Sequence, residues 1–447
     1  MPATLSTALG LVVIAAAVVA IARRVDVRLV LLLAALALGG LAGDVGPVVR
    51  KFFETLANEQ FVLPICTAMG FAQVLRHSGC DRHLVHLLAR PLRRAGPFLI
   101  PGAVLVGFVV NVSVISQAST AVAVGTVLVP LLRSAGLSPV TVAAALSLGA
   151  SVGGEVLNPG APEINTIAAR AKVEATACVE RVAPVLLLQL AVALAVFWPL
   201  CLRAERAARS AVPPDDAKAA GAAEFRVNLL KALVPVIPLA LLMIVGPPFN
   251  LVELPRGWLV DARDTRVTTY SARLVGVCML AGTGLAALTA PRTVGQVAGV
   301  FFEGAGSALA RIVSIIVVAS CFAEGVILLR LNEPIAAAIR ARPDLVWPLA
   351  GGLTLLFAVL CGSGYAATQS LYGIFVTDAM GTELMLRIGA VVSVSAAAGR
   401  TMSPVAVVNL TTASLAETEP LAVARRVAVP LLVATTVTVT VAWLRSG

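Results

Sequence analysis

Three ionisable residues stand in otherwise apolar sequence and are the first candidates for chemistry. Glu155 and Glu163 lie in GGEVLNPGAPEINT (153–166), and Arg400 lies in GRTMSPVAVVNLTT (399–412). An ionisable side chain at membrane depth is costly and marks a binding site or an ion pathway by default. A guanidinium can bind a carboxylate through two hydrogen bonds, and a glutamate can take up a proton or hold a cation. The alternatives are a structural Arg–Glu pair or a position near the water boundary.

Small polar residues interrupt the apolar sequence in four places, the two segments above and the segments 111–120 and 361–370. Prolines in the first two segments remove backbone donors and break helices, and glycines allow tight turns. A helix that is broken within a membrane offers its partly positive N-terminus to an anion, and its freed carbonyls can coordinate Na⁺. Packing between helices is the ordinary role of any single serine or threonine there.

The four interruptions taken together favour a binding site, because the same kind of interruption recurs along the chain. The predicted substrate-binding residues are Ser116, Gln117, Ser119, Thr120, Asn158, Gly362, Ser363, Gly364, Arg400, Thr401 and Ser403. The predicted ion-coupling residues are Asn111, Ser113, Glu155, Glu163, Asn165, Thr368, Asn409 and Thr411. Glu324 and Arg311, at the apolar stretch 312–329, are weaker candidates, and Arg311 can also be interpreted as an end residue that snorkels to the interface.

A shift of 245 residues aligns the interruptions in pairs. SQASTA (116–121) falls on CGSGYA (361–366), and GGEVLNP (153–159) falls on AGRTMSP (398–404), so that Glu155 matches Arg400. The chain is therefore interpreted as two copies of one unit. Internal repeats with interrupted apolar segments are typical of secondary transporters.

The composition agrees with a membrane protein. The chain has 447 residues, 59% hydrophobic and 13% charged, whereas a soluble domain has about 25% charged residues. This excludes a disordered chain, a nucleic-acid module and an ordinary cytosolic enzyme, so the expected partner is the lipid bilayer and not a nucleic acid. The net charge of +10 indicates basic cytoplasmic loops.

Cofactor and enzyme signals are missing from the sequence. The seven cysteines show no metal or disulfide spacing, the three histidines fall in one basic loop (77–86), and no nucleotide or protease motif occurs. We therefore expect no enzymatic activity, no metal and no cofactor, with Na⁺ only as a possible coupling ion. An intramembrane enzyme would need a catalytic dyad that the sequence does not provide.

The elements that must position these residues are membrane helices. Apolar stretches of spanning length are 5–22, 27–41, 61–75, 182–202, 229–245, 274–290, 312–329 and 427–444. Arginines directly after the first stretch favour a retained span over a cleaved signal peptide. The fold class expected is an all-α polytopic membrane protein of two inverted repeats, each with about five spans, a re-entrant hairpin and a broken helix. An odd number of spans inserts the second repeat in the opposite sense.

The predicted domains follow from this count. The first repeat is 1–202, with a hairpin at 97–133 and a broken helix at 139–172. A cytoplasmic linker (203–228) leads to the second repeat (229–447), with a hairpin at 345–378 and a broken helix at 384–412. Two full crossings could replace each hairpin, but a polar turn such as NVSVISQAST cannot face lipid.

Four segments resemble the anaerobic C4-dicarboxylate carrier (DcuC) family of the ion transporter superfamily. They are GFAQVLRHSGCDRHLVHLLARPLRRAG (70–96), GSGYA (362–366), GRTMSPVAVV (399–408) and EPLAVARRVAVPLLV (419–433). The resemblance covers residues 60–445. It implies a secondary carrier for succinate, fumarate or malate in the bacterial inner membrane.

The resemblance also implies an architecture and a site. Related carriers are homodimers in which a transport domain moves against a scaffold like an elevator, and residues 116–120, 362–364 and 400–404 would line the site. Coupling to Na⁺ or H⁺, or exchange, is open. A cation/proton antiporter or another organic-anion carrier of the same superfamily is the alternative. The segment with Glu163 departs from the family pattern, and an acidic group near a dianion is unfavourable unless it is protonated or paired with a cation.

Overall fold

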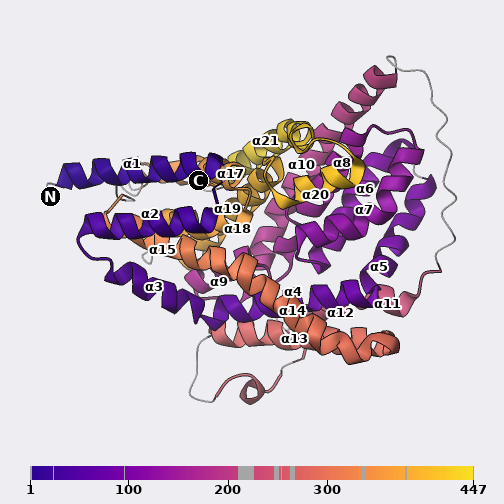
Figure 1. Cartoon of the computed structure of the whole chain (residues 1–447), viewed down its shortest axis with the longest axis horizontal. Helices are drawn as coiled ribbons and strands as arrows, with labels where there is room; N and C mark the ends of the chain where they lie inside the picture. Colours follow the sequence, from indigo (N-terminus) through magenta and orange to yellow (C-terminus); the bar gives the residue numbers. More distant parts are fainter. Residues whose placement is uncertain are drawn as a thin grey trace.

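The regular elements of this computed structural model are all helical among the residues it describes (Figure 1). These residues are 3–23, 25–94, 96–209, 226–245, 251–252, 254–261, 267–331, 333, 339, 341–377 and 380–445. The helices of the first half are α1 (Ala3–Ala22), α2 (Val27–Ala42), α3 (Gly46–Leu56), α4 (Glu59–Ser78), α5 (Cys80–Ala89), α6 (Leu99–Ser113), α7 (Gln117–Ser134), α8 (Pro139–Ser151), α9 (Pro162–Ala171) and α10 (Ala175–Arg209). Those of the second half are α11 (Leu229–Leu233), α12 (Ile237–Val245), α13 (Val267–Thr289), α14 (Val297–Ala308), α15 (Ser314–Leu328), α17 (Val346–Cys361), α18 (Gly364–Phe375), α19 (Thr382–Met402), α20 (Val407–Ala416) and α21 (Pro420–Leu444).

Seven helical runs among the described residues are long and apolar enough to cross a membrane. They are Pro139–Ala171, Ala175–Arg206, Ala272–Thr289, Val294–Leu328, Pro343–Cys361, Thr382–Met402 and Pro420–Leu444. A crossing needs about 20 apolar residues. The chain is therefore a multi-pass membrane protein.

The helices pack in two groups. In the α4 group (α2–α4 and α13–α15), α4 packs on α13 and α14, and α15 packs on α2 and α3. In the hairpin group (α6–α10 and α17–α21), α6 packs on α8, α17 on α19, α8 on α20, and α10 on α19 and α21. Figure 1 shows α1–α3 and α15 at the left, α4, α13 and α14 along the bottom, and α5–α8 and α20 at the right. The two groups meet where α9 packs on α4 and α18 packs on α15.

Two helical hairpins lie in the hairpin group. Helices α6 and α7 are joined by the turn 114–116, and α17 and α18 by the turn 362–363. Gly362 has φ +68°, a left-handed conformation that favours glycine, and an added Cβ would lie 3.2 Å from the backbone of Ala406. Helix α18 has 12 residues, a rise of about 18 Å, which is short of the ~30 Å hydrocarbon core.

Two broken helices complete the group. Helix α8 is followed by a 3₁₀ turn (Gly154–Leu157) and then by α9, and α19 is followed by a short break and then by α20. Helices α9 and α20 differ by 245 residues at both ends, and each ends on a left-handed residue, Lys172 or Glu417. The same local structure therefore recurs at the offset found in the sequence.

Three details differ from the sequence-based expectations. The stretch 229–245 is not one helix, because a turn at 234–236 separates α11 from α12. The turn contains Pro235, and Pro238 follows it. Helix α10 continues through Arg209, so the predicted linker begins as helix, and residues 210–225 lie outside the described residues. The three histidines lie on helices α4 and α5, not in a loop.

Candidate functional site

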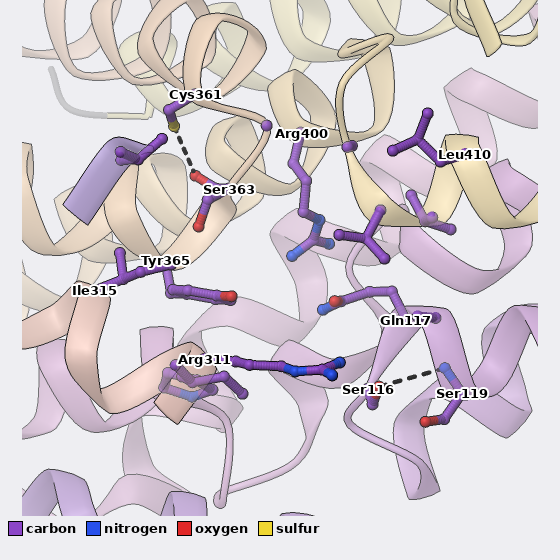
Figure 2. Close-up of a pocket in the computed structure, with 18 of the residues that line it drawn as sticks. Ser116, Gln117, Ser119, Arg311, Ile315, Cys361, Ser363, Tyr365, Arg400 and Leu410 are labelled. Atoms are coloured by element: carbon purple, nitrogen blue, oxygen red, sulfur yellow. Dashed lines mark hydrogen bonds between the residues drawn. The ribbon is translucent and has the colours of Figure 1, made fainter. Parts of the chain in front are cut away.

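A cavity of about 780 Å³ lies between the α4 group and the hairpin group (Figure 2). The α4 group contributes one face of α4, with Gln73 and Arg76, and one face of the run from α14 to α15, with Ser307 and Arg311. The hairpin group contributes both hairpin turns and both helix breaks. Segments far apart in the chain therefore meet at one site.

Four helices of the hairpin group begin at this cavity. First-turn residues of α7, α9, α18 and α20 line it. Ser116 and Ser363 cap α7 and α18 by accepting hydrogen bonds from Ser119 N and Ala366 N. Helix α20 has no side-chain cap. Each N-terminus carries about half a positive charge, so this wall of the cavity suits an anion without any full charge.

An ion cluster lies behind the helix starts. Arg400 Nη2 donates to Glu155 Oε1 at 2.5 Å, and Arg400 Nη1 lies 3.6 Å from Glu163 Oε1. The three side chains are between 1% and 4% exposed. With two carboxylates and one guanidinium, the cluster carries one negative charge in excess if both glutamates are ionised. No other residue in the described part of the chain donates a hydrogen bond to the carboxylate of Glu163, whereas Glu155 Oε1 also accepts from Gln117 Nε2 at 2.9 Å.

Both helix breaks are held by hydrogen bonds from the arginine and from two asparagines. Arg400 Nη2 donates to Ser151 O at 2.7 Å, and its Nε donates to Ser151 Oγ at 3.1 Å. The amide of Asn409 donates to the carbonyls of Thr401 and Ser403, both at 2.8 Å. The amide of Asn165 donates in the same way across the first break. Orphan carbonyls at a helix end need such partners when they are buried.

The structure brings a part of the predicted site to the cavity. The predicted residues that line it are Ser116, Gln117, Ser119, Gly362, Ser363, Glu163 and Arg400. The others lie outside its lining, namely Asn111, Ser113, Thr120, Glu155, Asn158, Gly364, Asn165, Thr368, Thr401, Ser403, Asn409 and Thr411.

Several of these residues hold the hairpin turn together. Asn111 accepts from Glu155 N and donates to Val114 O, and the Thr120 hydroxyl donates to the same carbonyl. Asn158 donates to the carbonyl of Val112. They support the lining residues from behind.

Other lining residues were not predicted from the polar interruptions of the sequence. Tyr365, Gln73, Arg76 and Ser307 line the cavity, and Arg311, a weaker candidate, lies there as well. A signal exists for two of them, because Gly304, Ser307 and Arg311 follow a helical spacing that places them on one face. Glu324 lies outside the cavity lining.

The described residues contain no group of three or more histidine, cysteine, aspartate or glutamate side chains placed to hold a metal ion. The polar groups in the cavity wall are guanidinium, amide, hydroxyl and carboxyl groups. Their arrangement suits the reversible binding of a small anion.

Known proteins that are similar to this chain include transporters. An uncharacterised transporter of Haemophilus influenzae is 43% identical over 90 residues, which cover 20% of this chain and 62% of that protein. Another uncharacterised transporter of the same organism is 28% identical over 212 residues, 46% of this chain and 70% of that protein. The first match thus spans less than two thirds of that relative. Residues 56–445 match the C4-dicarboxylate anaerobic carrier family, DcuC. Because the match covers nearly the whole chain and both helix breaks, the protein belongs to the DcuC family of C4-dicarboxylate carriers.

Proposed function

We propose that this protein is a secondary carrier that moves small C4-dicarboxylates, such as succinate, fumarate or malate, across the bacterial inner membrane. The observation that carries the proposal is the cavity where α7, α9, α18 and α20 begin. Four partial positive charges attract a carboxylate, and serine hydroxyls and the Gln117 amide can donate to it. Such a site binds an anion reversibly, as a carrier requires.

Alternating access is the second part of the proposal. The recurrence of hairpin and broken helix at one offset supports two repeats of inverted orientation, the architecture of many secondary transporters. The site lies between two packed groups, which meet where α9 packs on α4 and α18 packs on α15. The hairpin group would move as an elevator against the α4 group, with the bound anion at the hairpin turns. A homodimer held through the α4 group fits this division.

Glu163 is the group that we propose for ion coupling. It is almost fully buried, it lines the cavity, and its carboxylate accepts no hydrogen bond from any other residue that the structure describes. Arg400 Nη1 lies 3.6 Å from Glu163 Oε1, so it would repel a Na⁺ ion bound at that carboxylate. A proton neutralises the excess charge of the cluster without that repulsion, so a proton is favoured over Na⁺ as the coupling ion. Protonation also removes the unfavourable interaction between Glu163 and a bound dianion.

Transport into proteoliposomes tests the function. Labelled succinate should enter saturably when an inward pH gradient is imposed, fumarate and malate should compete, and a Na⁺ gradient alone should add little. Liposomes preloaded with succinate should test exchange in the same assay. Absence of saturable uptake and of exchange under every gradient would refute the carrier proposal. Uptake that requires Na⁺ would refute only the assignment of the proton as the coupling ion.

A further inference from the structure

Four arginines line the cavity, and their partners differ. Arg28 donates to Asp26 and to the carbonyl of Ala310, and Arg76 donates to the Gln73 side chain. Arg400 pairs with Glu155. Arg311 forms no ion pair and no hydrogen bond with any residue that the structure describes. It is therefore the one lining cation in the described part of the chain whose donors are all available.

The backbone that carries Arg311 is specialised and firmly placed. Residues Leu309–Val313 form a π-helical turn between α14 and α15, a feature that occurs frequently at functional sites. Two helical turns earlier, α14 packs closely on α4, because an added Cβ on Gly304 would lie 2.7 Å from the carbonyl of Met69. Ser307 and Ile315 line the cavity on the same face as Arg311. The guanidinium thus projects from a helical run that packs closely on α4.

Arg311 faces the helix starts from the opposite side of the cavity. Figure 2 shows its side chain extending across the cavity below Tyr365, toward Ser116 and Gln117. Those two residues form the cap and first position of α7. The guanidinium of Arg311 therefore enters the cavity from the α4 group, whereas the four helix starts belong to the hairpin group.

Arg400 cannot serve as the main counter-charge for a dianion. Its guanidinium is 4% exposed and stands between two carboxylates, so the cluster as a whole is not positive. A guanidinium bound to carboxylates has lost most of its attraction for a further one. Arg311, which is exposed to the cavity, keeps this attraction.

We propose that Arg311 binds one carboxylate of the substrate while the helix N-termini of the hairpin group bind the other. The anion then bridges the α4 group and the hairpin group, and Arg311 makes the site select dicarboxylates over monocarboxylates. A guanidinium suits this role because its planar fork matches a carboxylate. The inference rests on the proposed carrier function and deepens it by assigning the second pole of the site.

The test compares two ligands in proteoliposomes, succinate and succinamate, in which an amide replaces one carboxylate. In Arg311→Gln we expect the KM for succinate to rise about 10- to 100-fold, the effect of losing a charge-assisted hydrogen bond. The inhibition constant of succinamate should not change, because its single carboxylate binds at the helix N-termini. Arg311→Lys, which keeps the charge but loses the fork, should fall between wild type and Arg311→Gln.

A matched control is Arg292→Gln, since Arg292 is exposed and lies outside the cavity lining, in the 3₁₀ segment that precedes α14. It should transport succinate like the wild type. An unchanged KM for succinate in Arg311→Gln overturns the inference, and so does an equal loss for succinate and succinamate. A wild-type protein that transports no dicarboxylate refutes the carrier function itself, which separates the two failures.

Discussion

Arg400→Gln probes the buried ion cluster most directly. The substitution removes the only cation in contact with Glu155 and Glu163 among the described residues, together with the 2.5 Å hydrogen bond to Glu155. Two buried carboxylates then remain without a counter-charge. Removing one partner of a buried pair costs about 3–5 kcal/mol, because the remaining charge is left uncompensated. We expect Arg400→Gln to lower the free energy of unfolding by an amount of this order.

Glu163→Gln is the matched control for that change. It removes a carboxylate that accepts no hydrogen bond from the other described residues, and it leaves one guanidinium with one carboxylate. The cluster becomes neutral, so the stability should stay the same or rise. The double variant Arg400→Gln with Glu155→Gln should recover part of the loss, since side chains in direct contact are coupled by about 0.5–3 kcal/mol.

The assay is thermal unfolding of the purified protein in one detergent, at one protein concentration and one heating rate, because membrane proteins often unfold irreversibly. The expected order of Tm is Glu163→Gln at or above wild type, then the double variant, then Arg400→Gln. Equal Tm values for Arg400→Gln and wild type would refute the assignment of Arg400 as the counter-charge of both glutamates. A large decrease in the Tm of Glu163→Gln would refute the inference that the ion cluster carries an excess negative charge.

Three further experiments test the coupling and the backbone of the site. Glu163→Gln should abolish uptake driven by a pH gradient yet keep succinate exchange, and pH-driven uptake at the wild-type rate would contradict the coupling proposal. Asn409→Ala leaves two buried carbonyls at the helix break without their donor, a cost of about 1–3 kcal/mol for each unsatisfied group. Thr411→Ala is its control and should change Tm little, because the Thr411 hydroxyl donates to the Val407 carbonyl within the same helix; equal Tm shifts would count against the bridging role of Asn409. Gly362→Ala forces a side chain into a left-handed turn at φ +68°, which costs about 1–2 kcal/mol. Gly352→Ala meets open space inside a helix and should stabilise the protein by about 0.5–1 kcal/mol. The two variants should therefore differ in Tm and in succinate uptake, and matching values would argue against strain in the hairpin turn.

The helix breaks could be located from the sequence because their causes are local. Proline and glycine act within a few residues of their own position. The segments 153–166 and 399–412 therefore contain the breaks that the structure shows before α9 and α20. The offset of 245 residues could be read directly from the repeated interruptions, and the DcuC resemblance rests on contiguous motifs, so the family match confirms it.

The roles of single polar residues could not be read in this way. Asn111 and Asn158 stand in the same kind of segment as Ser116, yet their amides bond neighbouring backbone groups behind the turn, while Ser116 lines the cavity. A period or a motif does not say which polar side chain satisfies a buried carbonyl and which one faces the open space. This depends on how the hairpin packs against the break.

The sequence by itself determined the membrane class, the family and the four interrupted segments, because composition, proline and glycine positions and contiguous motifs are properties of the chain. Only the tertiary structure decided which arginine is available to a ligand. Arg400 and Glu155 are separated by 245 residues and form a pair at 2.5 Å, whereas Arg311 projects into the cavity without a partner among the described residues. The availability of a charge depends on distances in space, since Coulomb attraction and desolvation vary with the surroundings and not with the position in the chain.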